Sequence, residues 1–266
     1  MTRRRWIADE VSGNTAALVG DHAAHLARVL RAQVGQEFDI ATGDEIRRGT
    51  ITTISYDRVE FALDTKSHRA LISKPFAAPF SAPRITLALA IFKFDRMEWA
   101  MEKCTEIGAD RIIPVIARRS DAHLAAAAAK RYERWQRIVL EVAEQSRRAA
   151  PPEIAAPVKL KDLSGVLPAG ALTRVVLAES LAGSEEKNRL GEILPSAMRP
   201  ETSEVALAIG PEGGWTDREL DWFYEEGWIA ASLGDTILRA ETAAVVATAL
   251  ALEALRRFSN LLPFSP

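Results

Sequence analysis

Two segments near the carboxyl terminus, EVALAIGPEGGWTDREL (204–220) and WIAASLGDTILRAETAAVVATALALEAL (228–255), decide the fold of this chain. Each reads as a buried strand, a glycine-bearing loop and a helix. In the first segment the apolar run stops at Gly210, as in strands that are covered on both faces of a parallel sheet. Thr216 and Glu219 then have the spacing of a capping box, which predicts the start of a helix.

The second segment repeats this plan, with a strand over 229–233, a loop over 234–239 and a helix from Glu241 to about Arg257. In open α/β sheets, ligands bind beyond the carboxyl ends of the strands, so both loops are expected at that edge. Glycines allow positive φ angles and let backbone N–H groups approach a ligand closely. A tight Pro-Gly turn without a ligand is the alternative interpretation of GPEGG.

Residues 1–73 have a different pattern from the rest of the chain. Short, partly alternating segments predict a small β-barrel with one helix over 21–31. Three prolines in residues 74–83 predict a linker, and strands alternate with helices from residue 84 onward. This alternation predicts a mainly parallel sheet with right-handed crossovers.

Within the second part, strands are predicted over 85–92, 111–117 and 173–180, and helices over 95–107, 130–148 and 185–198. Asp95 and Glu98 have capping-box spacing, and Gly108 predicts the end of that helix. Pro114 removes a backbone donor from its strand, which favours an edge strand or a bulge. The Pro-rich stretch 149–160 is interpreted as a loop.

Composition indicates a globular protein of the reducing cytosol. Hydrophobic residues make up 48% and charged residues 26%, and the single cysteine excludes an internal disulfide framework. No apolar stretch is long enough to span a bilayer, and the start has no signal-peptide core. Residues 84–148 carry 13 Lys or Arg against 9 Asp or Glu, so a basic surface for nucleic acid would lie there and at Arg3–Arg5. Solvated helix faces are the alternative interpretation of any single run of these charges.

Several common kinds of site are missing from the sequence. It has no P-loop, no GxGxxG after the first strand of the predicted sheet, and no set of residues suited to a Ser-His-Asp or Cys-His catalyst. His22 and His25 are three residues apart on the predicted helix, but no further histidine or cysteine lies near them. No metal site is predicted.

The motifs of the chain resemble those of one family. GPEGG followed by LGDTILRAETA, with KFDRMEWAMEKCTEIGADRIIPV (93–115), EVAEQSRR (141–148) and HLARVLR (25–31), is similar to the RsmE family of 16S ribosomal RNA uracil-N3 methyltransferases in the SPOUT (α/β-knot) superfamily. The resemblance implies a PUA-like RNA-binding barrel over 1–73 and a SPOUT domain with a C-terminal trefoil knot over 84–266. It also implies S-adenosylmethionine as methyl donor, ribosomal RNA of the small subunit as substrate, and a homodimer.

Carried over residue by residue, the resemblance places the methyl donor against three loops. The expected contacts are Leu177, Ala178, Glu179, Gly210, Pro211, Glu212, Gly213, Gly214, Leu233, Gly234, Ile237, Leu238, Arg239, Thr242 and Ala243. RNA contacts are expected at Arg4, Arg5, His25, Arg28, Arg31, Lys93 and Arg119. For the HLARVLR residues, simple helix packing with exposed arginines remains the alternative.

The implied reaction assigns roles to two residues of the last loop. The N3–H of uracil is a weak acid, so catalysis must stabilise negative charge as the proton leaves. Arg239 is the candidate catalytic residue because a guanidinium can hydrogen-bond a uracil oxygen, although an ion pair with Glu241 or Glu212 is the alternative. Glu241, at a helix start, is expected to orient Arg239 or the donor. No general base is assigned.

Two rival functions stay open. One is a related SPOUT enzyme that acts on transfer RNA or on ribose, and the other is a non-catalytic RNA-binding protein on the same scaffold. The intact GPEGG and LRAET loops argue against the second.

Overall fold

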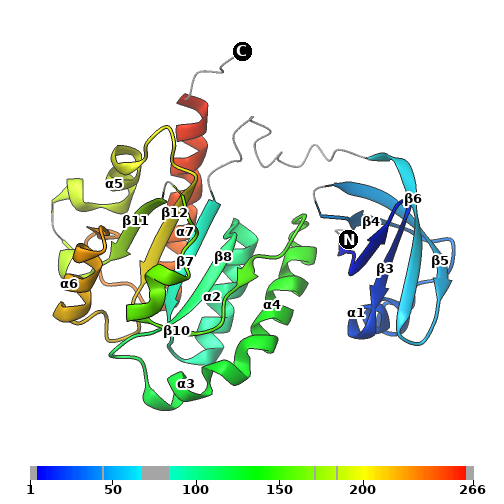
Figure 1. The fold of residues 1–266 in the computed structure, drawn as a ribbon, viewed down its shortest axis with the longest axis horizontal. Helices are drawn as coiled ribbons and strands as arrows, with labels where there is room; N and C mark the ends of the chain where they lie inside the picture. The colour runs from blue at the N-terminus through cyan, green and yellow to red at the C-terminus, as the bar shows by residue number, and fades with distance from the viewer. Residues whose placement is uncertain (1–4, 44, 68–83, 171, 184, 262–266) are drawn as a thin grey trace. The chain divides into compact units, whose positions relative to one another are not determined.

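The computed structural model describes residues 5–43, 45–67, 84–170, 172–183 and 185–261. The predicted linker over 74–83 and Arg4 lie outside these ranges. The chain divides into two compact units (Figure 1). The smaller unit contains Met1–Lys74 together with Leu140–Pro151, and the larger contains Pro75–Val139 together with Pro152–Pro266.

The smaller unit is a curled, mostly antiparallel sheet, as the alternating segments predict. Its described strands are β1 (Trp6–Ile7), β2 (Glu10–Ser12), β3 (Thr15–Val19), β4 (Glu37–Ala41), β5 (Ile46–Ile54) and β6 (Arg58–Ser67). They pair in the order β1-β4-β5-β6-β3-β2, and only the β1–β4 pair is parallel within this described sheet. The buried core inside the sheet is built from large side chains that include Trp6, Leu18 and Phe61.

The helix predicted over 21–31 is shorter and partly of another type. An α-helical turn, α1 (Gly20–Ala24), leads into one π-helical turn, η1 (His25–Val29), in which Leu30 N donates to the His25 carbonyl. A π turn holds one more residue than an α turn, so it rotates the residues after it about the helix axis. The spacing of Leu26, Val29 and Leu30 along this helix predicts that they form its packed apolar face. Leu26 is buried, but Val29 and Leu30 are exposed, which corrects that prediction.

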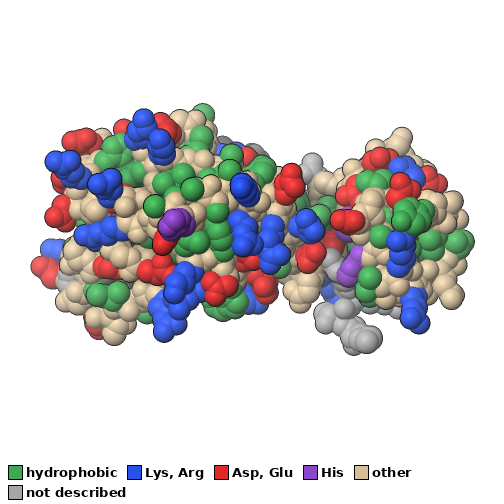
Figure 2. Space-filling view, turned by 90° about the horizontal axis from the view of Figure 1, so that it is seen from below, with side chains coloured by type: hydrophobic (Ala, Val, Ile, Leu, Met, Phe, Trp, Pro, Cys, Tyr) green, Lys and Arg blue, Asp and Glu red, His purple; other side chains and the backbone are tan. Residues whose placement is uncertain are grey.

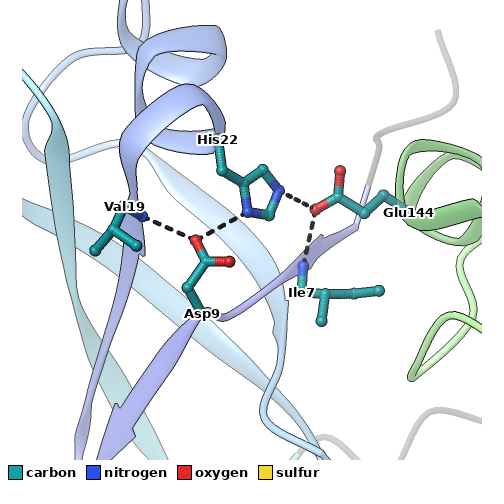
Figure 3. A network of polar contacts seen from close by, with 5 residues as sticks. All are labelled: Ile7, Asp9, Val19, His22 and Glu144. Carbon is teal, nitrogen blue, oxygen red and sulfur yellow. Dashed lines mark hydrogen bonds and ion pairs between the residues drawn. The ribbon is translucent and has the colours of Figure 1, made fainter. Parts of the chain in front are cut away.

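Residues 140–151 join the smaller unit through a buried carboxylate (Figure 3). Glu144 Oε1 accepts hydrogen bonds from Ile7 N (3.0 Å) and His22 Nε2 (2.6 Å). The other ring nitrogen of His22 contacts Asp9 Oδ2 (3.0 Å), which also accepts from Val19 N. Burial lowers the pKa of His22, but the hydrogen bonds to Asp9 and Glu144 outweigh it and raise the pKa to about 9.

The larger unit is built on a parallel sheet, as the alternation of strands and helices predicts. Its described strands are β7 (Arg84–Ala90), β8 (Arg111–Ile116), β9 (Glu153–Ile154), β10 (Val158–Lys159), β11 (Leu172–Leu177), β12 (Glu204–Ile209) and β13 (Ile229–Ala231). The order is β10-β8-β7-β12-β11-β13, with β9 also paired to β8. Strand β8 is therefore not an edge strand, and Pro114 is tolerated because it lies between the short stretches that pair with β9 and β10.

Helices cover both faces of this sheet. Those described are α2 (Phe94–Ile107), α3 (Ala122–Ala127), α4 (Tyr132–Gln145), α5 (Leu190–Ala197), α6 (Asp217–Glu225) and α7 (Ala240–Leu261), with 3₁₀ turns η2 (Ala128–Arg131), η3 (Leu160–Gly165), η4 (Glu179–Leu181) and η5 (Glu186–Asn188). One buried cluster joins α2, α5 and α7 to one face, and the other joins α6 and η3 to the opposite face. None of the described helices has the length and apolarity needed to span a bilayer.

Two predicted helix starts have different outcomes. The capping box at Thr216 and Glu219 is confirmed at the start of α6. The capping box at Asp95 is wrong, because α2 begins one residue earlier with Lys93 at the N-cap position and no side-chain cap. Glu98 instead receives a hydrogen bond from Arg134 Nε at 2.9 Å, so a tertiary ion pair has replaced the local interaction.

The face of α7 that packs into the core consists of small residues. Ala244, Ala247 and Ala251 are fully buried, and Thr248 donates to the buried thiol of Cys104 on α2 at 3.4 Å. Small side chains let α7 approach α2 and the sheet closely. Burial raises the pKa of the Cys104 thiol to about 12, so this cysteine is a packing residue.

Candidate active site

Three loops meet at one edge of the sheet in the larger unit. Strand β11 lies between β12 and β13 and is parallel to both, so the three strands end at the same side. Backbone hydrogen bonds join the first and third loops, from Ala178 N to the Ala231 carbonyl (3.0 Å) and from Gly183 N to the Gly234 carbonyl (3.2 Å). These bonds tie the loop after β11 to the glycine-bearing loop after β13, and residues of both glycine-bearing loops line one cavity, as their place after buried strands predicts.

A cavity that is open in part to solvent lies between these loops. Most of the predicted cofactor contacts line it. The first loop contributes Leu177, Ala178 and Glu179; the second contributes Gly210, Pro211 and Gly214; the third contributes Leu233, Ile237, Leu238 and Ala243. The predicted contacts that do not line the cavity are Glu212, Gly213, Gly234, Arg239 and Thr242.

Sequence reasoning missed lining residues that lie beside the motifs. They are Ala182, Ile209, Trp215, Ala231, Ser232, Thr236 and Ala240. Each is close in sequence to a predicted residue. The position of the three loops could therefore have predicted these residues, although no motif did. The lining is mostly apolar, with Glu179 as the only charged side chain among the described residues that form it.

The second loop requires glycine at its last position. Gly214 N donates to the Pro211 carbonyl at 2.8 Å, and Gly214 has a φ of +67°. A Cβ atom at this position would lie 2.9 Å from Oε2 of Glu179. The turn therefore brings the backbone of one loop against the carboxylate of another, and only glycine fits without displacing it.

Arg119 holds the second loop from outside the cavity. Its Nη1 donates to the carbonyls of Gly213 (2.7 Å) and Trp215 (3.2 Å). Glu219 supports the same segment, because its Oε1 accepts from Arg118 N at 2.6 Å while Oε2 accepts from Thr216. The residues that follow β8 thus fix the GPEGG loop, and Arg119, predicted to contact RNA, has this structural contact in the described chain.

Arg239 lies between two residues that line the cavity, Leu238 and Ala240, and is exposed. Within the described residues, its side chain makes no hydrogen bond or ion pair. The alternative in which it pairs with Glu241 or Glu212 is therefore not what the structure shows. A cation at this position is free to meet a ligand.

Arg96, from α2, is the arginine that lies near Glu241 and Glu212. Its Nε lies 3.8 Å from Glu241 Oε1, and its Nη1 lies 3.9 Å from Glu212 Oε1. Glu241 is mostly buried in the first turn of α7, and its Oε2 has no protein partner. Arg96 belongs to the DRMEW segment, but nothing in its local pattern marked it out, because only the fold brings α2 to these two loops.

The residues predicted to bind RNA have different surroundings in the smaller unit. Arg5 is 3% exposed and its guanidinium donates to the Arg147 carbonyl; burial lowers its pKa, which nearby Asp39 opposes. Its side chain therefore packs within the unit rather than facing solvent. His25 is half-buried, with its ring 6.0 Å from that of Trp6.

Arg28, Arg31 and, in the larger unit, Lys93 are exposed. On the face of the larger unit seen in Figure 2, Lys and Arg side chains are interspersed with Asp and Glu side chains. The excess of cations counted over residues 84–148 does not form a uniform basic face in that view. Specific contacts of single arginines are the better guide to a partner.

Comparison with known proteins places the chain in a family. A model of an RNA methyltransferase domain matches residues 80–252. The ribosomal RNA small subunit methyltransferase E of Synechocystis is 33% identical over 242 residues, which cover 91% of this chain and 74% of that protein. The chain belongs to the ribosomal RNA small subunit methyltransferase E family.

Solved structures of similar chains carry a cofactor. A ribosomal RNA small subunit methyltransferase E from Neisseria gonorrhoeae, bound to S-adenosylmethionine, is 28% identical, with a TM-score of 0.72 over 93% of this chain and 95% of that one. A putative methyltransferase from Legionella pneumophila, in complex with the same cofactor, is 26% identical, with a TM-score of 0.74 over 95% and 97%. The α/β fold with a barrel-like first part is thus that of the methyltransferase E family.

Proposed function

We propose that this chain transfers the methyl group of S-adenosylmethionine to N3 of one uridine in 16S ribosomal RNA. The observation that carries the proposal is the cavity formed by the loops after β11, β12 and β13, with the exposed and uncommitted Arg239 beside it. Membership of the methyltransferase E family and the cofactor bound to two similar structures support it.

The lining of the cavity suits S-adenosylmethionine. Pockets that bind ligands of this class are mostly apolar and carry a few polar groups, as this one does. When bound, the cofactor supplies an electrophilic methyl group on a sulfonium sulfur. Glu179, the charged side chain in the lining, would accept hydrogen bonds from ribose hydroxyls, and Gly214 lets the second loop lie against that carboxylate without a Cβ in the way.

Arg239 is proposed as the catalytic residue for methyl transfer. The N3–H bond breaks, the proton leaves to solvent or an unassigned base, and the new N3–methyl bond forms as the methyl–sulfur bond breaks. Negative charge spreads onto the uracil oxygens during this step, and a guanidinium stabilises it by hydrogen bonding. Glu241 is proposed to hold the start of α7, with Arg96 as its counter-ion.

The substrate must offer an unpaired uridine, because N3 lies on the Watson–Crick edge of the base. RNA contacts are proposed at His25, Arg28, Arg31 and Lys93. We further infer a cytoplasmic homodimer that acts on ribosomal RNA of the small subunit. The knot through which α7 would thread stays a prediction from the resemblance.

Replacement of Arg239 tests the proposal. Arg239→Ala should lower the rate of methyl transfer about 100- to 1,000-fold while calorimetry shows the affinity for S-adenosylmethionine within about twofold of wild type. Arg257→Ala is a matched control, because Arg257 is an exposed arginine on α7 that pairs with Glu253. Full turnover by Arg239→Ala would remove Arg239 from the mechanism.

The product distinguishes this function from its rivals. The substrate is small-subunit RNA from a strain without the enzyme, and the readout is reverse transcription after reaction. An N3-methyl group blocks base pairing, so a new stop at a single uridine is expected. A wild-type chain that fails to bind S-adenosylmethionine, or that methylates transfer RNA or a ribose hydroxyl instead, would overturn the assignment.

A further inference from the structure

Tyr56, in the turn between β5 and β6 of the smaller unit, presents its ring to solvent. The residue is 81% exposed. Arg28, from η1, lies over one face of the ring with Cζ 4.0 Å from the ring centroid, and its Nη2 donates to the Tyr56 carbonyl at 3.0 Å. The guanidinium therefore fixes the ring from one side and leaves the rest of it uncovered.

The segment that supplies Arg28 has two uncommon backbone features. It contains the π-helical turn η1, and Arg31 follows with a φ of +53°. Non-glycine residues adopt this left-handed conformation at a cost, and both features are enriched at functional sites. Around these two features Ala27 and Ala32 still pack against the core of the barrel, while Val29 and Leu30 are exposed.

The same segment exposes apolar side chains that the core does not need. Val29, Leu30 and Val34 are 66%, 52% and 61% exposed. Figure 2 views the smaller unit from the side on which α1 lies in Figure 1, and on that face hydrophobic side chains lie beside Lys or Arg side chains. Exposed apolar side chains beside cations are a feature of binding surfaces.

The charges around Tyr56 favour an anionic partner. Arg31 is exposed, and its side chain has no hydrogen bond or ion pair within the described chain. Arg58 is already neutralised by Glu10 and Glu60. Asp57, in the same turn as Tyr56, is the acidic neighbour. Arg28 and Arg31 are thus the cations available to phosphate groups.

We infer that the Tyr56–Arg28 pair is a stacking platform for an unpaired base of the RNA substrate. An aromatic ring with one face fixed by a guanidinium and the other free stacks on any base, whereas a base inside a duplex has no free face to offer. Arg31 contacts the neighbouring phosphate, and the apolar side chains of Val29 and Leu30 cover the sugar and base edge. This inference rests on the proposed function only in taking RNA as the substrate.

Substitutions of Tyr56 in the full chain test the platform. The probe is a fluorescein-labelled single-stranded oligouridylate, and the readout is fluorescence anisotropy. Tyr56→Ala should weaken binding about 5- to 100-fold, the range for loss of one base–aromatic stack, and Tyr56→Leu should do the same because it keeps bulk but has no π face. Tyr56→Phe should bind within about twofold of wild type.

Tyr224→Ala is the matched control, because Tyr224 is 51% exposed on α6 in the other unit. It should leave the anisotropy curve unchanged. The same oligonucleotide annealed to its complement should bind wild type and Tyr56→Ala equally. Thermal melting should show all variants folded, since Tyr56 is hardly buried.

The outcomes separate this inference from the proposed function. If wild type binds S-adenosylmethionine and methylates RNA, but Tyr56→Ala and Tyr56→Leu bind the oligouridylate as wild type does, the platform is overturned and the function stands. Loss of methyl transfer to ribosomal particles without weaker oligouridylate binding would show that the surface contacts a ribosomal protein, and would also overturn it. Loss of binding in both variants, with retention in Tyr56→Phe, establishes it.

Discussion

Replacing Gly214 by alanine should weaken cofactor binding through two separable effects. Gly214 has a φ of +67°, and an added Cβ would lie 2.9 Å from Glu179 Oε2. An alanine costs about 1–2 kcal/mol in the left-handed region. In the free protein the loop can relax and relieve this strain. Binding of S-adenosylmethionine then has to return the loop to the strained conformation, so the affinity should fall about 5- to 30-fold. Displacement of the Glu179 carboxylate adds to this loss.

A series of glycine substitutions isolates the two effects. Gly234 has a φ of +130° but no atom within 4 Å of an added Cβ, so Gly234→Ala introduces strain without a collision. Gly191, on α5, has neither feature, and Gly191→Ala is the control that should leave affinity unchanged. Isothermal titration with S-adenosylmethionine should rank the loss of affinity as Gly214→Ala, then Gly234→Ala, then Gly191→Ala.

The refuting result is specific. If Gly214→Ala binds S-adenosylmethionine with the affinity of Gly191→Ala, the second loop does not close on the cofactor, and the role of the GPEGG glycine is only to make the turn. A melting temperature measured for each variant separates loss of affinity from loss of fold.

Two further predictions concern stability. Glu219→Ala should lower the free energy of unfolding of the larger unit by about 2–4 kcal/mol in urea denaturation, because it removes the capping box and leaves the Arg118 N–H without its acceptor. Asp217→Ala, in the same helical turn, is the control and should cost under about 1 kcal/mol. Equal losses of stability in the two variants would contradict this prediction. The folded-state pKa of His22, about 9, lies above its ordinary value of 6.5, so the contribution of the protonated ring, up to about 3 kcal/mol, is complete below about pH 6.5 and is lost as the pH rises through about 9. His22→Gln should flatten the dependence of the free energy of unfolding on pH. If that variant keeps the pH dependence of the wild type, protonated His22 does not contribute this stability.

Local sequence patterns correctly predicted the strands and helix starts that depend on interactions between residues close in sequence. The apolar run before Gly210 gives β12, and Thr216 with Glu219 caps α6 because both partners lie within one turn. The same local logic failed at Asp95, where Arg134, far along the chain, competes for Glu98. It also failed in the HLARVLR segment, where the widened turn η1 turned Val29 out to solvent.

By itself, the sequence determined that a β-rich unit is followed by a parallel α/β unit, and it determined which loops form the site. Both follow from the periodicity of apolar residues and the spacing of glycines, which are properties of residues close in sequence. Only the tertiary structure decided which charges meet. It paired Arg96 rather than Arg239 with Glu212 and Glu241, and it brought Arg28 over Tyr56. Such contacts join residues far apart in sequence, and their energies depend on distances of a few ångströms that no periodicity encodes.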